Sequence, residues 1–202
     1  MAEWIKGNRY LSVNEMRNNA EIVYSYLLSK GWSKNAICGM LGNMEAESTI
    51  NPGIWQSLIE GSGGGGGFGL VQWTPYTNFT NWADSNGYEW TDGYAQLKWI
   101  DEVTASFGQW IPTINYYISF EDFKKTSKSV EWCASAFLKN FERAGVEVED
   151  IRRESAVSWY EYLADSDPDI PDIPDEPDEP TKPVKDKRLS KLLLMAIATD
   201  YD

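Results

Sequence analysis

The sequence contains no histidine, and this absence narrows the hydrolytic chemistry open to the chain. Zinc hydrolases, Cys–His amidases and Ser–His–Asp esterases use an imidazole as a ligand or as a base. Carboxyl groups remain as the side chains that can donate or accept a proton during hydrolysis. We therefore expect no metal ion and no organic cofactor, and we do not expect zinc-dependent cleavage of peptide bonds.

Basic residues are scarce, with 18 Lys and Arg against 31 Asp and Glu, so the formal net charge is −13. The sequence has no basic stripe that could neutralise phosphates, and nucleic-acid binding is not expected. An acidic protein is also not attracted to an anionic surface over long distances. If the substrate lies in a bacterial wall, another mechanism has to deliver the protein there.

Long apolar runs are absent as well. No segment is long enough to cross a membrane, and the first residues lack the apolar core of a signal peptide. We expect no membrane partner, synthesis in the cytosol, and release by lysis or as part of a particle. The only two cysteines, Cys38 and Cys133, each lie in an apolar helical pattern, which predicts buried free thiols.

Apolar residues recur at helical spacing in several segments. Ser12 and Glu15 fit a capping box that begins the first helix, which should end near Gly31. Ser33 is the expected N-cap of the second helix, which should end at about residues 48–51, before Pro52-Gly53. Three further helices are predicted over residues 92–107, 129–142 and 150–163.

Between Trp55 and Trp73 the helical period disappears, and five consecutive glycines occupy residues 63–67. This composition predicts a mobile loop that enters a short hairpin or turn. The fold class is therefore mostly α, or α+β: a helical domain over residues 1–164 with a small β-hairpin lobe. Prolines and acidic residues alternate in residues 165–185, which predicts an extended linker. Residues 186–202 would form a short tail, helical near 189–198, that serves as a docking peptide or belongs to a second domain.

Two glutamates, Glu45 and Glu47, lie at the C-terminal end of the second predicted helix. The helix dipole and apolar surface disfavour ionisation there. A carboxylic acid that stays protonated can donate its proton to the leaving oxygen of a glycosidic bond. At about 100° per residue, the helical wheel puts Glu45 beside Leu41 and Glu47 beside Met40, and does not choose between them. By spacing alone, each is equally well explained as a solvated carboxylate at a helix end.

Two ordered motifs resemble the signature of lysozyme-superfamily enzymes. Residues 47–52 read Glu-Ser-Thr-Ile-Asn-Pro, and residues 67–75 read Gly-Phe-Gly-Leu-Val-Gln-Trp-Thr-Pro. Goose-type lysozymes and soluble lytic transglycosylases share this outline. The sequence is more similar to the phage tail lysozyme family, which includes tail-tip proteins of small Bacillus podophages. Gly31-Trp32, residues 36–44 and Phe141-Glu142-Arg143 also match, so the resemblance covers roughly residues 8–163.

The resemblance implies a lysozyme-like glycosidase that cleaves peptidoglycan between N-acetylmuramic acid and N-acetylglucosamine. Such a protein would be made in the host cytoplasm and would sit at the tail tip of the virion, where other tail proteins would be its neighbours. It would open the wall locally while DNA is delivered. Glu47 matches the catalytic acid of the family, and Gln72 matches a residue that helps to hold the sugar. The glycines at 67 and 69 would let the backbone approach the glycan. Three aromatic residues are expected either to line the cleft or to form the hairpin core: Phe68, Trp73 and Tyr76.

A second catalytic carboxylate is not evident. Retaining glycosidases place a nucleophile about 5–5.5 Å from the acid, and inverting ones a base farther away. The acidic residues conceivable for this role are Glu60, Asp84, Asp101 and Glu142. For Glu142 we favour a structural role, in which it pairs with Arg143 or with a residue of the cleft. Two alternatives to a hydrolase stay open: a lytic transglycosylase that leaves an anhydro sugar, and a catalytically silent wall-binding component of the tail.

Overall fold

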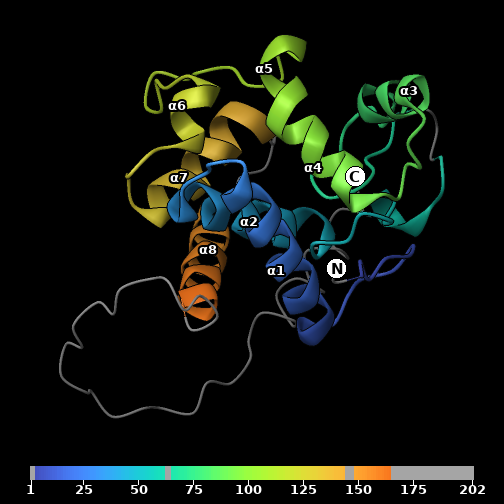
Figure 1. Ribbon diagram of the computed structural model, residues 1–202, viewed down its shortest axis with the longest axis horizontal. Coiled ribbons are helices and arrows are strands. Elements are labelled where there is room, and N and C mark those ends of the chain that lie inside the picture. Colours follow the sequence, from blue (N-terminus) through green and yellow to red (C-terminus); the bar gives the residue numbers. More distant parts are fainter. Residues whose placement is uncertain (1–2, 62–64, 144–147, 165–202) are drawn as a thin grey trace.

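A computed structural model describes residues 3–61, 65–143 and 148–164. These residues form helices joined by turns and irregular segments (Figure 1). The elements are α1 (Val13–Ser29), α2 (Lys34–Ser48), η1 (Gln56–Leu58), α3 (Thr77–Asn86), α4 (Gly93–Lys98), η3 (Trp99–Val103), α5 (Thr104–Phe107), α6 (Phe120–Lys124), α7 (Val130–Phe137), η4 (Leu138–Glu142) and α8 (Glu149–Ala164).

The signals predicted for the first two helices are confirmed. The Glu15 carboxylate accepts hydrogen bonds from the Ser12 N–H at 2.8 Å and from the Ser12 hydroxyl at 2.9 Å, which gives α1 its capping interaction. The Ser33 hydroxyl oxygen accepts from the Ala36 N–H at 3.2 Å and begins α2. Thr49 ends α2 in the left-handed conformation, with φ of 53°.

The two predicted helices at 92–107 and 129–142 each contain a π-helical turn. Asp92 caps α4, which continues through the π turn η3 into α5. Ser129 caps α7, which continues into the π turn η4 and ends at Glu142. Such turns interrupt α-helices with an extra residue and are frequent at functional sites. The last predicted helix corresponds to α8.

Two helices, α3 and α6, were not expected from the sequence. α3 has ten residues and buries only Phe79, Thr80 and Ala83. α6 has only five residues, although the Ser119 hydroxyl oxygen accepts from the Asp122 N–H at its start. Helices this short carry too few apolar positions for a period to be recognised.

The predicted β-hairpin lobe is reduced, within the described residues, to two isolated antiparallel bridges. These join Trp55 to Phe68 and Phe68 to Trp73. The segment is thus a turn-rich lobe in which hydrogen bonds from side chains replace most of a strand ladder. The predicted linker at 165–185 and the tail at 186–202 lie outside the described residues.

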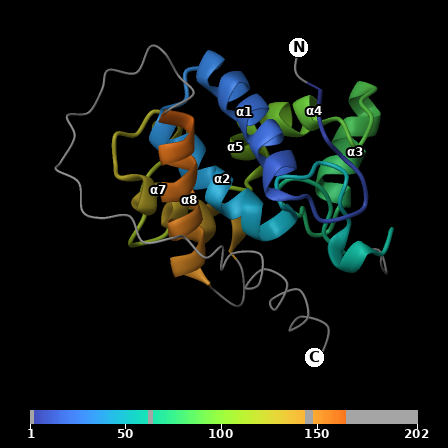
Figure 2. The ribbon, with the colours of Figure 1, turned by 90° about the horizontal axis from the view of Figure 1, so that it is seen from below.

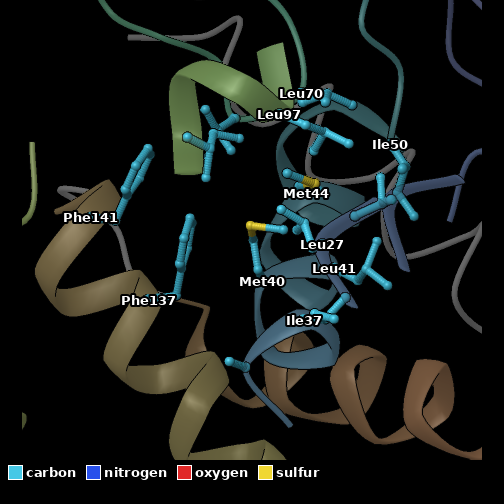
Figure 3. Close-up of a cluster of buried hydrophobic side chains, with 14 of the residues drawn as sticks. Leu27, Ile37, Met40, Leu41, Met44, Ile50, Leu70, Leu97, Phe137 and Phe141 are labelled. Carbon is cyan, nitrogen blue, oxygen red and sulfur yellow. The ribbon is translucent and has the colours of Figure 1, made fainter. Parts of the chain in front are cut away.

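The core is built around α2, whose residues 36–45 are all buried. Both ribbon views place α7 and α8 on one side of α2 and α3 on the other (Figures 1 and 2). Side chains from α2 and from α7–η4 meet Leu70 and Leu97 in one apolar cluster (Figure 3). A helix covered on every side is mostly apolar, and residues 36–45 are apolar or glycine except for Asn43 and Glu45.

Two glycines of α2 let its neighbours approach closely. A Cβ at Gly39 would lie 2.5 Å from the Cβ of Cys133 on α7, and a Cβ at Gly42 would lie 2.3 Å from the carbonyl oxygen of Arg152 on α8. No side chain fits at either position. Cys38 and Cys133 are free and buried as predicted, and burial raises the pKa of both thiols to about 12.

Candidate active site

The two glutamates at the end of α2 have different environments. Glu45 is 2% exposed, and its Oε2 accepts a hydrogen bond from Trp159 Nε1 of α8 at 2.8 Å. The Glu47 side chain keeps 21% of its surface exposed. A carboxyl group must be exposed to contact a polymeric substrate, and of the two glutamates Glu47 has the larger exposed surface.

An arginine that the sequence argument did not anticipate contacts Glu47. Arg152 Nη2 of α8 lies 2.5 Å from Glu47 Oε1, although the two residues are 105 positions apart. The Arg152 side chain is only 9% exposed. A guanidinium and a carboxyl group at this distance form a charge-assisted hydrogen bond, which also fixes the orientation of the carboxyl group.

Asn43 fixes the position of that arginine. Its Oδ1 accepts from Arg152 Nη1 at 3.1 Å, and its Nδ2 donates to the carbonyl oxygens of Gly39 and Ala134. Asn43 is fully buried, so its polar atoms have to be paired inside the protein. The resulting chain of contacts runs from α7 through α2 to α8 and ends at Glu47.

A second carboxyl group, that of Glu142, interacts electrostatically with this cluster. It is the last residue of η4, and its Oε1 is buried with no hydrogen-bond partner among the described residues. Burial and the negative charge of Glu47 raise the pKa of Glu142 well above its ordinary value, against the opposing charges of Arg152 and Arg143. Among the described residues, Arg143 forms no hydrogen bond with Glu142, and its Nη1 donates to the carbonyl oxygen of Gln109 instead.

The other carboxylates considered from the sequence are engaged elsewhere or exposed. Asp101 pairs with Lys124 at 3.1 Å and accepts from Trp32 Nε1 at 2.8 Å. Asp84 accepts from Trp90 Nε1 at 2.7 Å, and Glu60 is exposed on the turn-rich lobe. Of the four, Glu142 has the clearest electrostatic connection to Glu47.

The Gly-x-x-Gln motif forms a tight turn near the end of α2. Gln72 has φ of 47°, and its Nε2 donates to the carbonyl oxygens of Ile54 at 3.2 Å and Gly69 at 3.1 Å. Its side chain therefore stabilises the turn, while the residue remains partly exposed. Gly69 has φ of 78°, and a Cβ there would lie 2.7 Å from Gln96 Oε1. Contact of Gln72 and Gly69 with a sugar stays a prediction.

One hydrogen bond connects the two motifs directly. The Ser48 hydroxyl, one residue after Glu47, donates to the carbonyl oxygen of Leu70 at 2.7 Å and to that of Met44 at 3.0 Å. Ser48 is fully buried. The Glu-Ser pair thus has a physical explanation: the glutamate carries the carboxyl group, and the serine attaches the helix end to the turn.

The three predicted aromatic residues of the cleft differ in exposure. Phe68 and Trp73 are 1% and 2% exposed. They belong to the core, which favours the expectation that they fill the interior of this lobe over the expectation that they line the cleft. Tyr76 is half-buried, and its ring packs against Trp55 with 5.1 Å between centroids. Tyr76 is therefore the one of the three with surface left for a ligand.

The functional residues that sequence reasoning missed are Arg152 and Asn43. Arg152 lies four residues before Ala156, at a position where the apolar stripe of α8 would continue. Asn43 lies four residues after Gly39 in the buried helix α2. A polar residue within an apolar stripe could have indicated both residues, because a buried polar side chain needs a hydrogen-bond partner inside the protein.

Within the described part of the chain, no helix is long and apolar enough to cross a membrane. The same residues contain no cluster of three or more His, Cys, Asp or Glu side chains suited to a metal ion.

The helical domain, the glutamate at the end of a buried helix and the adjoining glycine-glutamine turn are features of lysozyme-like proteins. Residues 18–163 match the phage tail lysozyme family, and the chain belongs to that family. It is 48% identical over 156 residues to morphogenesis protein 1 of Bacillus phage B103. The match covers 77% of this chain and 42% of the phage protein, so the chain spans less than half of the length of that relative.

Proposed function

We propose that the protein is a peptidoglycan glycosidase of a phage tail, which cleaves the bond between N-acetylmuramic acid and N-acetylglucosamine. Glu47 is the acid that protonates the leaving oxygen, and Gln72 and Tyr76 contribute to the surface that holds the glycan. The role is local penetration of the wall while the phage delivers its DNA. Membership of the phage tail lysozyme family and relation to a phage morphogenesis protein support this proposal.

The observation that carries the proposal is the arrangement around Glu47. Its carboxyl group is partly exposed, is held by Arg152 at 2.5 Å, and lies one residue from the Ser48 hydroxyl that ties α2 to the Gly-x-x-Gln turn. A carboxyl group fixed by packing rather than by a loop can keep its orientation while a glycan binds.

The experiment is digestion of purified peptidoglycan by the wild-type chain and by Glu47→Gln. The substitution keeps the shape of the side chain and removes the transferable proton, so turnover should fall by about 10²–10⁴-fold. Glu131→Gln, at an exposed position on α7, makes the same charge change away from the site and should retain wild-type turnover. Wild-type turnover in Glu47→Gln would refute the assignment of the acid.

A lytic transglycosylase would use the same acid but would close the muramic acid ring on itself. Glu142 Oε1 is buried, which limits the contact of this oxygen with a sugar and so supports a mechanism that needs no protein nucleophile. Mass spectrometry separates the two, because hydrolysis adds one water to each cut and transglycosylation adds none. Binding without release of any sugar, unchanged in Glu47→Gln, would instead identify a silent wall-binding component.

A further inference from the structure

Left-handed backbone conformations occur in two consecutive pairs of residues near the candidate site. Thr49 and Ile50, which directly follow the Glu-Ser pair at the end of α2, have φ of 53° and 56°. Ser57 and Leu58 in η1 have φ of 54° and 58°. This conformation is unfavourable for residues other than glycine, and most of all for β-branched ones. Such strain persists only where the surrounding structure enforces it, and it is concentrated at functional sites.

The first strained pair is held by the N-terminal strap, our name for residues 4–11. The strap runs beside the turn-rich lobe in both ribbon views, where it is the dark blue segment (Figures 1 and 2). The Leu11 N–H donates to Thr49 Oγ1 at 2.9 Å. Asn19 Nδ2 of α1 donates to the carbonyl oxygen of Ile50 at 2.9 Å and to a carbonyl oxygen of the strap at 2.7 Å.

The strap is anchored at the residue that follows this pair. Asn51 is fully buried, and its Nδ2 donates to the carbonyl oxygens of Gly7 at 2.7 Å and Arg9 at 2.6 Å. Its Oδ1 accepts from the Gly7 N–H at 3.3 Å. A Cβ at Gly53 would lie 2.8 Å from the backbone nitrogen of Gly7, so the strap lies directly against the backbone of the lobe. The strap is therefore a fixed part of the site's surroundings.

Asn8 extends from the strap to the second strained pair. Its Nδ2 donates to the carbonyl oxygen of Leu58 at 2.8 Å, and its Oδ1 accepts from the Trp55 N–H at 3.0 Å. These two contacts lie on either side of Gln56. The Gln56 N–H donates to the carbonyl oxygen of Gly67 at 2.9 Å, and Gln56 Oε1 accepts from the Gly67 N–H at 2.9 Å. A chain of contacts thus runs from Asn8 to the first residue of the turn motif at 67–75.

The other side of the turn motif is held separately. The carbonyl oxygen of Leu70 accepts from the Ser48 hydroxyl at 2.7 Å, and the Leu70 N–H donates to Gln96 Oε1 at 2.8 Å. Both partners are fully buried, and neither belongs to the strap. The Gly67 side therefore depends on η1 and on Asn8 in a way that the Leu70 side, next to the end of α2, does not.

We propose that Asn8 is a positioning residue for glycan binding: it acts through Gln56 to hold Gly67, and with it the glycan-binding turn, in place. The proposal rests on the glycosidase function given above. Without Asn8, Leu58 is free to leave its strained conformation, and Gln56 should shift with it. Glu47 is held by α2 and α8, so proton donation should be unaffected while the binding of the substrate weakens.

The first test is the kinetics of Asn8→Ala on solubilised peptidoglycan. Loss of the two hydrogen bonds should raise KM about 3–10-fold, with kcat within about twofold of wild type and an unchanged pH profile. The replaced residue is exposed, so the variant should fold. Asn81→Ala, at an exposed position on α3, is the matched control and should keep both constants at their wild-type values.

A purely structural role for Asn8 would change a different constant. Partial unfolding removes active molecules, so the apparent kcat would fall while KM stayed at the wild-type value. That result would overturn the proposal, and so would a KM equal to that of the Asn81→Ala control.

The second test does not depend on activity. Hydrogen exchange followed by NMR reports on the Gln56 and Gly67 amides, which both donate hydrogen bonds in the wild-type chain. In Asn8→Ala both amides should exchange at least about threefold faster, while the amides of the buried helix α2 keep their wild-type rates. Unchanged exchange at both amides would overturn the proposal. Faster exchange in a chain that releases no sugar would support the hold of Asn8 on Gly67 and refute the glycosidase function, so the two failures are distinguishable.

Discussion

The two halves of the candidate site are built in different ways. On the helical side, α2 and α8 bring Glu47 and Arg152 into contact from distant parts of the sequence, and Glu142 at the end of η4 acts on them electrostatically. On the turn side, side-chain amides hold the backbone: Gln72 bonds to Ile54 and Gly69, and Gln96 bonds to Pro52, Leu70 and Trp90. Helix packing therefore positions the charged side chains, whereas hydrogen bonds from side chains to the backbone fix the conformation of the turn.

This contrast predicts that changes on the helical side alter stability and pH dependence, whereas changes on the turn side alter mainly the fit to the glycan.

The largest effect is expected from Gly42→Ala. The new Cβ would lie 2.3 Å from the Arg152 carbonyl oxygen, so α2 and α8 have to separate. The free energy of unfolding should fall by about 3 kcal/mol in a denaturant titration. Gly65→Ala is the control, since nothing lies within 4 Å of that position, and equal stability of the two variants would refute the close packing.

A smaller effect is expected from Arg152→Met, which leaves Glu47 and Asn43 without their shared donor. Loss of one partner from a buried pair costs about 3–5 kcal/mol, and the partial exposure of Glu47 reduces this to roughly 2 kcal/mol. Arg153→Met is the matched control, because Arg153 pairs with Glu149 on the surface with 39% of its side chain exposed. It should cost less than about 1 kcal/mol in the same measurement. If the two variants lost the same stability, the contact with Glu47 would be no more than a surface pair.

On the turn side, Gly69→Ala should cost about 1–2 kcal/mol, because φ of 78° is unfavourable for alanine and Gln96 occupies the space for a Cβ. Its effect on cleavage should be a higher KM at an unchanged pH profile. Gly61→Ala tests the backbone term alone, since Gly61 has φ of 64° with nothing within 4 Å. A shifted pH profile in Gly69→Ala would contradict the division between the two halves.

The smallest effect concerns Glu15, which lies in the first turn of α1 and belongs to neither half. Hydrogen bonds from Arg9, and then from the Ser12 N–H and hydroxyl, lower the pKa of Glu15 to about 2. The folded pKa lies below the ordinary value of 4.5, so this contribution is present above pH 4.5 and is lost as the pH falls towards 2. The melting temperature of Glu15→Gln should be slightly below that of wild type at pH 6 and should converge with it near pH 2. A constant difference across this range would contradict the capping role, and Glu154→Gln, on an exposed face of α8, is the control.

The sequence predicted the helices that have strong local signals. Capping residues such as Ser12 and Ser33 act on neighbours within one turn, so their effect can be read from the chain. The short helices α3 and α6 were missed because their apolar positions are too few. The family resemblance selected Glu47 and Gln72, and the structure supplied the reason for the serine at position 48.

The ion pair between Glu47 and Arg152 could not be predicted in this way. It depends on how α8 crosses α2, and that crossing depends on the absence of a side chain at Gly42. Glu142 was considered as a second carboxylate of the site, but no local sequence pattern indicated the π turn that it ends. Contacts between distant elements require the packing to be known first.

The π turn at the end of α7 has a consequence for insertions and deletions. It takes one more residue per turn than an α-helix, and each residue in a helix rotates the following side chains by about 100°. Removal of any one of residues 138–141 would restore regular winding and rotate the carboxyl group of Glu142 by about a quarter of a turn around the helix axis. The direction of that group is thus encoded by the length of the segment as much as by its composition, and a single-codon deletion there would be more harmful than many substitutions.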